Sequence, residues 1–254
     1  MNRLYIIIGI AALALPVSAQ KYRVAKVERT RIVIDSTYDA PLSKRTARIF
    51  EPYRAKVDSV MSPVVGKAAR HMNAQRPEGL LSNLLPDILL WAAPRYGEHP
   101  DFAVYNMGGI RAAIAEGDVT YGDVLSVAPF ENKICFLTLT GDKVMQLFRE
   151  MSTVLGEALS HGVRLVITKD GTLKEATLNG EPIDPGRTYR VATIDFLAQG
   201  NDRLTAFKSG TDLNSPQEAE NNTRFIIMDY FREKLAQGEA VDSRLEGRIT
   251  IVDQ

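Results

Sequence analysis

Two amphipathic helices are predicted in the first third of the chain. Apolar residues recur there at spacings of three and four, which places them on one face of a helix. The first helix starts at about Thr46 and ends before Pro63, and the second begins near Ser82, whose hydroxyl can cap the first turn. The apolar faces consist of Ile49, Tyr53, Val57, Val60 and Met61 in the first helix and of Leu84, Leu85, Ile88, Leu89 and Ala92 in the second.

The rest of the chain intersperses short apolar runs with helical segments. Strands are predicted at 102–105, 134–139, 163–168, 176–178, 189–194 and 249–252, helices at about 140–151 and 218–235, and a strand or hairpin within 22–38. The order lacks the strict βαβ rhythm of a doubly wound sheet, and no repeat or change of composition marks a linker. We therefore predict a single α+β domain with mixed β-sheets flanked by helices.

The N-terminus has the pattern of an export signal. One positive charge at Arg3 precedes an apolar run from Leu4 to Leu15, and Val17-Ser18-Ala19 then supplies the small residues of a signal-peptidase site. The run is shorter than the roughly 20 residues that a membrane-spanning helix needs, which disfavours the alternative of a retained anchor. We expect residues 1–19 to be a signal peptide, residues 20–254 to form the domain, and the protein to be periplasmic or secreted.

Composition and charge disfavour several classes of function. The chain is 45% hydrophobic, and its 31 basic and 31 acidic residues cancel, so nothing favours nucleic-acid binding. Cys135, the only cysteine, lies in an apolar run and is expected to be a buried, inert thiol; the alternative is a nucleophile. His71, His99 and His161 form no metal-binding pattern, so neither catalytic nor metal-ligating residues are predicted in this chain.

The segment from Asn106 to Arg111 is the strongest candidate for a binding turn. It follows the predicted strand 102–105 and contains Gly108 and Gly109, whose missing side chains let a backbone approach a ligand. Arg111 then offers a planar set of donors to an anion or to the edge of a heterocycle. The alternative is an ordinary strand-to-helix connection with Arg111 in solvent. The glycine pair does not match the G-x-G-x-x-G or P-loop patterns, so neither dinucleotide nor P-loop phosphate binding is indicated.

Several further blocks follow in a fixed order. They are Gly117-Asp118-Val119-Thr120-Tyr121-Gly122-Asp123-Val124-Leu125, Pro129-Phe130-Glu131-Asn132, Leu139-Thr140-Gly141, and the run from Tyr189 to Asp202. Together they resemble the C-terminal domain of the 5'-nucleotidase and UDP-sugar hydrolase family, over roughly residues 57–252. In that family this domain grips the nucleoside, and a separate N-terminal metallophosphoesterase domain with two metal ions cleaves the phosphate ester.

The resemblance implies roles for single residues. Phe130 and Phe196 match the two aromatic rings that sandwich the base, and Asp202 matches the carboxylate that holds ribose hydroxyls. Asn106 and Arg111 match polar contacts to the base and the ribose, and the binding turn adds Gly108 and Gly109. The residues themselves leave alternatives open, because either phenylalanine could fill the core and Asp202 could merely form a turn.

The sequence also departs from the family pattern. Gly200-Asn201-Asp202-Arg203 stands where the family often has Gly-Gly-Asp-Gly, so two glycines are replaced. Asparagine tolerates a left-handed backbone, but Arg203 adds bulk and charge beside the expected pocket. A family arginine upstream of the second helix is represented by Arg76, shifted against Pro77. These departures leave open which base the pocket prefers and whether nucleoside binding is retained.

No counterpart of the metallophosphoesterase domain is recognisable. The resemblance implies that the two divalent metals belong to a separately encoded partner and that this chain recognises the nucleoside or nucleotide in a split 5'-nucleotidase. Three alternatives stay open: a stand-alone binding protein for nucleosides or nucleotide sugars, a degenerate domain kept for structural association, and an autonomous hydrolase. The last would need carboxylates such as Asp123, Asp195 and Asp202 to converge.

Overall fold

The computed structural model describes residues 26–32 and 43–253. The predicted signal peptide and most of the predicted strand or hairpin at 22–38 lie outside these residues, and the described part of the latter, 26–32, has no regular secondary structure. The chain divides into two compact units, residues 1–49 and 50–254. The second unit contains the sheets and the candidate site. The predicted extent of the domain, 20–254, stays a prediction.

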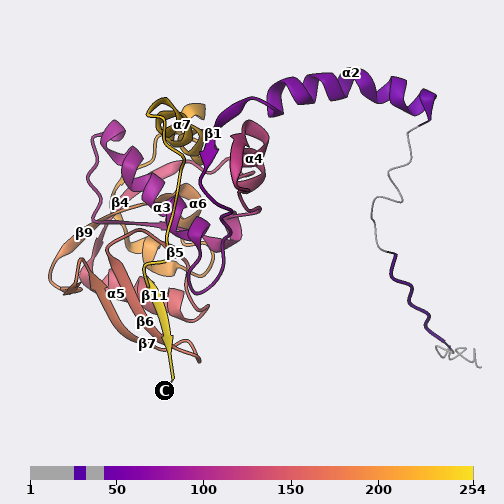
Figure 1. Cartoon of the computed structure of the whole chain (residues 1–254). Helices are drawn as coiled ribbons and strands as arrows, with labels where there is room; N and C mark the ends of the chain where they lie inside the picture. Colours follow the sequence, from indigo (N-terminus) through magenta and orange to yellow (C-terminus); the bar gives the residue numbers. More distant parts are fainter. Residues whose placement is uncertain (1–25, 33–42, 254) are drawn as a thin grey trace, which may run out of the picture. The chain divides into compact units, whose positions relative to one another are not determined.

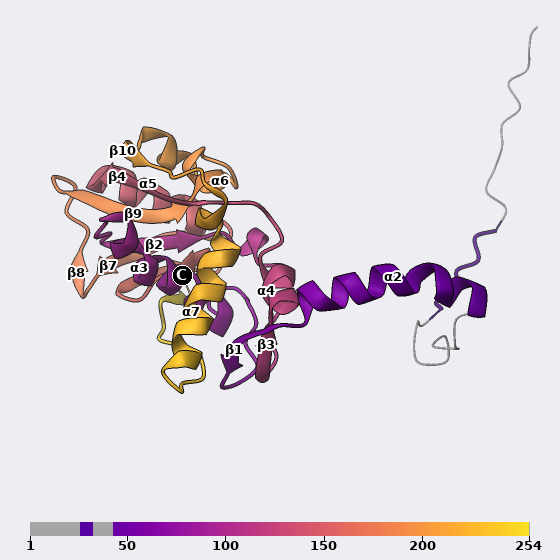
Figure 2. The same ribbon diagram turned by 90° about the horizontal axis from the view of Figure 1, so that it is seen from above.

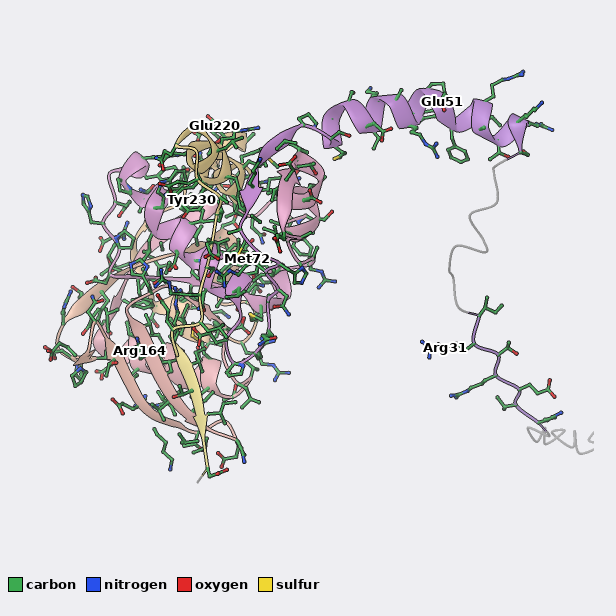
Figure 3. The ribbon with its side chains drawn as sticks, viewed as in Figure 1. Arg31, Glu51, Met72, Arg164, Glu220 and Tyr230 are labelled. Atoms are coloured by element: carbon green, nitrogen blue, oxygen red, sulfur yellow. The ribbon has the colours of Figure 1, made fainter. Side chains whose placement is uncertain are left out.

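The first predicted helix is present as α2, Lys44–Met61. Its apolar residues do share one face, but none of its residues is buried, and Tyr53 keeps 69% of its surface exposed. Figure 3 labels Glu51 on this helix. The periodicity thus predicts the helix, although its apolar residues stay exposed or, at Met61, half-buried.

A mixed five-stranded sheet forms the centre of the second unit, in the order β10-β4-β9-β2-β5. Strand β2 pairs parallel with β9, and the other neighbours are antiparallel. The strands are β2 Phe102–Tyr105, β4 Ile134–Thr140, β5 Ala158–Leu159, β9 Thr188–Ile194 and β10 Thr211–Asn214. Every residue of β2 is buried, so both faces of the sheet are covered there. Helices α3 (Leu80–Ala92) and α5 (Gly141–Ser152) supply part of this cover, since α3 packs on β2 and β9 and α5 packs on β4 and β9 (Figures 1 and 2).

A second sheet has the order β11-β6-β7-β8, and β1 pairs with β3 in a two-stranded ribbon. These strands are β1 Val64–Ala68, β3 Gly117–Thr120, β6 Val163–Thr168, β7 Leu173–Leu178, β8 Glu181–Pro182 and β11 Ile249–Val252. Asn179-Gly180 joins β7 to β8 with both residues at positive φ, 53° and 86°, as a tight hairpin requires. The α+β class with mixed sheets is confirmed.

The remaining helices are short apart from α7. They are α4 Tyr121–Val127, α6 Asp195–Ala198 and α7 Thr223–Ala236, with 3₁₀ turns η2 Ala93–Tyr96, η3 Met107–Gly109, η4 Thr205–Ser209 and η5 Ala219–Asn221. The predicted cap at Ser82 is wrong: α3 begins at Leu80, and the Ser82 hydroxyl donates back to the Gly79 carbonyl. The last helix begins later than predicted, because Asn222 caps α7 by accepting from the Arg224 N–H.

The core is built from apolar residues of all these elements. Phe102 and Phe148 pack with ring centroids 5.5 Å apart, and Met72, labelled with the half-buried Tyr230 in Figure 3, has no exposed surface. Cys135 is fully buried in β4, and burial raises the pKa of its thiol to about 11. At neutral pH this thiol stays protonated, which agrees with the predicted inert cysteine.

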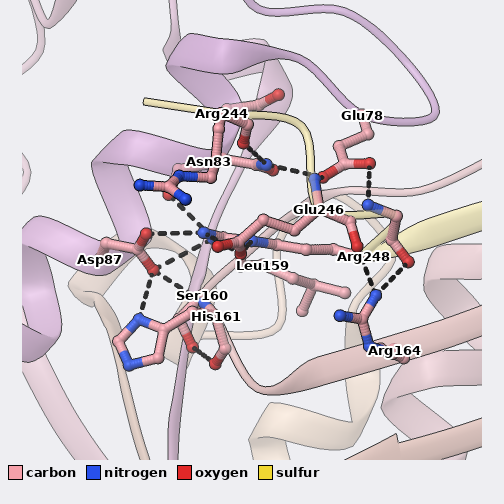
Figure 4. A network of polar contacts seen from close by, with 12 residues as sticks. Glu78, Asn83, Asp87, Leu159, Ser160, His161, Arg164, Arg244, Glu246 and Arg248 are labelled. Carbon is pink, nitrogen blue, oxygen red and sulfur yellow. Dashed lines mark hydrogen bonds and ion pairs between the residues drawn. The ribbon is translucent and has the colours of Figure 1, made fainter. Parts of the chain in front are cut away.

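A buried arginine links the C-terminal strand to helix α3 and strand β5. Arg248, with its side chain 4% exposed, donates through both terminal nitrogens to the Asp87 carboxylate at 3.0 and 2.7 Å (Figure 4). It also donates to the Leu159 carbonyl at 2.6 Å, and Asp87 accepts from the backbone N–H of His161. These bonds fix β5, which pairs with β2 and directly follows Glu157.

Candidate functional site

The binding turn begins at the buried end of β2. Asn106 is 4% exposed, and its side-chain amide donates to the Asp202 carboxylate at 2.6 Å. The turn closes as η3, in which the Gly109 N–H donates to the Asn106 carbonyl at 3.0 Å. A Cβ on Gly109 would lie 2.3 Å from the Asn106 Oδ1, so only glycine allows this packing. That Oδ1 is buried and has no partner in the described part of the chain.

A buried glutamate supports the turn through a hydrogen bond. This residue was not predicted from the sequence. Glu157, directly before β5, accepts from the Met107 N–H at 2.5 Å and pairs with Arg76, whose Nε donates to the Gly156 carbonyl. Burial raises the pKa of the Glu157 carboxyl, and Asp202 adds to the rise, while the Met107 N–H and Arg76 oppose it. No sequence signal connects a glutamate to a turn 50 positions upstream.

The loop after α6 brings Asp202 to the turn. The amide of Asn201 donates to the Phe196 carbonyl at 2.8 Å, which ties the loop to the helix that carries the ring. Positive φ angles occur at Gly200, Asp202 and Arg203, at 78°, 54° and 65°. Asn201 does not adopt the left-handed conformation that asparagine tolerates. Two residues with side chains adopt it beside the pocket, and such conformations cluster at functional sites.

A carboxylate joins the two segments that bear the aromatic rings. Asp195 accepts from the N–H of Lys133 and of Phe196, at 3.2 and 2.8 Å, and its own N–H donates to the Lys133 carbonyl. The start of α7 fixes the same loop, because Arg224 donates to the Pro129 carbonyl at 3.0 Å. The loop with Phe130 and the helix with Phe196 are thus held together by hydrogen bonds.

These elements surround a pocket of about 180 Å³. Its lining consists of Asn106, Gly108, Gly109, Phe130, Asn132, Phe196 and Asp202. Phe130 is 47% exposed and Phe196 half-buried, so neither ring is only a core residue. The volume is below the roughly 300–1,000 Å³ of pockets for drug-sized ligands, and it suits one ring system. The structure brings six of the seven predicted residues to this pocket, and their role in binding stays a prediction.

Two residues differ from the sequence prediction. Arg111 is not among the residues that line the pocket: its guanidinium donates to the Gly108 carbonyl at 3.3 Å and is otherwise exposed. Asn132 lines the pocket although it was not singled out. It belongs to the block Pro129-Phe130-Glu131-Asn132, so its position two residues after Phe130 could have indicated it.

The carboxylates considered for an autonomous hydrolase have separate structural roles. Asp123 completes the capping box of α4 by accepting from the Thr120 N–H at 2.8 Å, while Asp195 and Asp202 hold the loops described above. Within residues 26–32 and 43–253, no three histidine, cysteine or acidic side chains form a group that could hold a metal ion. Over the same ranges, no helix has the length and apolar character to cross a membrane.

Comparison with known proteins agrees with this fold. The family model of the 5'-nucleotidase C-terminal domain matches residues 61–209. The protein UshA of Escherichia coli K12 is 31% identical over 157 residues, 61% of this chain and 28% of that protein. The cell wall protein Lmo0130 of Listeria monocytogenes is 25% identical over 225 residues, 79% of this chain and 28% of that protein.

A solved structure shows the same fold. The crystal structure of a 5'-nucleotidase precursor from Thermus thermophilus superimposes with a TM-score of 0.72 and 27% identity, over 86% of this chain and 45% of that one. The chain belongs to the 5'-nucleotidase C-terminal domain family. It spans just over a quarter of the length of the two curated relatives from Escherichia coli and Listeria.

Proposed function

We propose that this chain is the nucleoside-recognition component of a split 5'-nucleotidase. The observation that carries the proposal is the pocket between Phe130 and Phe196, with the hydrogen-bonded pair Asn106 and Asp202 at its lining. Two aromatic faces can stack on a flat base, and a carboxylate can accept hydrogen bonds from two neighbouring ribose hydroxyls. The amide of Asn132 can donate to or accept from the edge of the base.

The hydrolytic step belongs, in this proposal, to a separately encoded metallophosphoesterase. The curated relatives from Escherichia coli and Listeria are more than three times as long as the segment that this chain matches. Two divalent metals in the partner would activate water and stabilise charge on the phosphate. The chain would act in the periplasm or outside the cell, in line with the cell wall assignment of the Listeria relative.

Calorimetry on the isolated chain tests recognition. Adenosine, AMP and UDP-glucose are titrated into the wild type and into the Phe130→Ala and Phe196→Ala variants. Loss of one stacking face should weaken binding by roughly 5- to 150-fold, because stacking contributes about 1 to 3 kcal/mol per base. Tyr53→Ala on α2, an exposed aromatic residue away from the pocket lining, is the matched control and should bind like the wild type. Absence of heat with all three ligands would contradict the proposal.

Reconstitution tests the split enzyme. A metallophosphoesterase that co-purifies with the chain should hydrolyse AMP efficiently only when the chain is added, and the Phe130→Ala variant should restore less activity. Full activity of the phosphoesterase alone would contradict the proposal of a split enzyme. The alternative of a stand-alone binding protein would then remain.

A further inference from the structure

A second pocket adjoins the first. It has a volume of about 270 Å³, and its lining consists of Arg76, Gly108, Val154, Glu157, Asp202 and Arg203. Gly108 and Asp202 line both pockets, so a ligand that fills the first can extend past Asp202 into the second.

Two arginines and two carboxylates line this second pocket, and all but Arg203 have a partner among the described residues. Glu157 is engaged by Arg76 and by the Met107 N–H, and the Asp202 carboxylate accepts from the amide of Asn106. Arg203 is exposed and makes no hydrogen bond or ion pair with any residue of 26–32 or 43–253. Its guanidinium is therefore available to a ligand, with a planar arrangement of donors that suits phosphate oxygens.

The position of Asp202 indicates which part of a ligand would reach Arg203. If Asp202 accepts from the ribose hydroxyls, as the proposed function requires, the space beyond it lies at the 2'- and 3'-hydroxyl edge of the sugar. The 5'-carbon is on the other side of the ribose ring. A group that enters the second pocket is thus attached through the hydroxyl edge, and the remaining hydroxyl can still donate to Asp202.

We propose that Arg203 is a specificity-determining residue that binds a phosphate carried on the 2'- or 3'-hydroxyl edge of the ribose. This inference rests on the proposed function, because it takes the base between the two phenylalanines as given. The chain would then prefer nucleotides phosphorylated at that edge over unmodified nucleosides. Arg76, although paired with Glu157, lines the same pocket and adds a second donor group.

Calorimetry with adenosine, 3'-AMP and 5'-AMP tests the inference on the wild type and on Arg203→Gln. Glutamine keeps an unbranched polar side chain, but it is shorter than arginine and lacks both the charge and the planar guanidinium donors. We expect 3'-AMP to bind at least about 10-fold more tightly than adenosine to the wild type, and this preference to disappear in Arg203→Gln while the affinity for adenosine stays unchanged. Arg54→Gln on α2 is the matched control for a general loss of positive charge and should keep the preference.

The other outcomes separate this inference from the proposed function. If the wild type binds adenosine but 3'-AMP no more tightly, or if Arg203→Gln keeps the preference, the inference is overturned and nucleoside recognition stands. If only 5'-AMP binds the wild type more tightly than adenosine does, and Arg203→Gln removes that difference, the assignment of the phosphate to the hydroxyl edge is wrong. If the wild type does not bind adenosine or either nucleotide, the proposed function fails and the inference fails with it.

Discussion

At the scale of single residues, the two adjacent glycines of the binding turn have different requirements. A Cβ on Gly109 would lie 2.3 Å from the Asn106 Oδ1 and 3.2 Å from the Tyr105 ring. A Cβ on Gly108 would meet only ordinary contacts, at 3.7 Å from the Asn106 amide nitrogen and 3.8 Å from the Asp202 carboxylate. Gly109 is thus required by the packing of the turn, whereas Gly108 leaves space that the two pockets share.

The Gly109→Ala substitution should therefore displace the Asn106 amide from Asp202 and abolish adenosine binding. Its cost in the free energy of unfolding should be about 1 to 3 kcal/mol, the penalty for disturbing a buried hydrogen-bonded group. Gly108→Ala is the control, with stability within about 0.5 kcal/mol of the wild type. Chemical denaturation and calorimetry on both variants check the prediction, and equal effects of the two substitutions would contradict it.

Single residues also differ in whether their place in the site could be predicted from the sequence. Phe130, Phe196 and Asp202 were found because each stands in a block that matches the family pattern. Glu157 was not found, because its contact with Met107 depends on the pairing of β5 with β2, and that pairing has no local signature. Arg111 was predicted from its position two residues after the glycine pair and from the family pattern, and neither determines where a long side chain points.

At the scale of elements, the short strand β5 supports the turn through the residue before it. Glu157 is buried beneath η3, and its pKa is raised chiefly by loss of hydration. An acid whose folded pKa lies above the unfolded value near 4.5 binds its proton more readily in the folded state. Its contribution to stability is fully present below that unfolded value and is lost as the pH rises through the higher folded pKa.

The free energy of unfolding of the wild type, measured relative to Glu157→Gln, should therefore rise as the pH falls from about 7 toward the unfolded pKa of 4.5. Glutamine does not titrate, so the difference between the two proteins isolates this carboxyl from other groups. Urea unfolding at several pH values measures it. A relative stability that falls with the pH would mean that the ion pair with Arg76 dominates and that the pKa is lowered.

Helix α2 illustrates the limit of local pattern at this scale. The spacing of Tyr53, Val57 and Val60 predicts a helix correctly, because a period of about 3.6 residues is a property of the segment itself. Whether the apolar face is covered depends on other parts of the chain or on other molecules. The start of α3 shows a similar limit, since Ser82 can cap a helix by type but lies inside this one.

At the scale of the whole molecule, the buried guanidinium of Arg248 joins three elements that lie far apart in the sequence. It contacts Asp87 of α3 and the Leu159 carbonyl of β5, and it directly precedes β11 (Figure 4). The α+β class could be predicted from the order of the elements, but this long-range network could not. A buried arginine in a polar segment near the C-terminus has the same local sequence signal as an exposed one.

Replacing Arg248 by alanine should destabilise the protein by about 3 to 5 kcal/mol, because it leaves the partly buried Asp87 carboxylate without its cation. Arg70→Ala is the control: its pair with Asp242 has side chains 55% and 45% exposed, so the loss should be below about 1 kcal/mol. Equilibrium denaturation of both variants measures the difference. Similar small losses for the two would contradict a role of Arg248 in joining the elements.

A crystal structure of the protein with adenosine tests most directly whether the pocket between Phe130 and Phe196 binds a nucleoside. We expect the adenine ring between the rings of Phe130 and Phe196 and a ribose hydroxyl within hydrogen-bond distance of the Asp202 carboxylate. A structure with the pocket between the phenylalanines empty would contradict nucleoside recognition at this site. In that case the nucleoside would lie elsewhere, for example in the open groove lined by Trp91 and Tyr230.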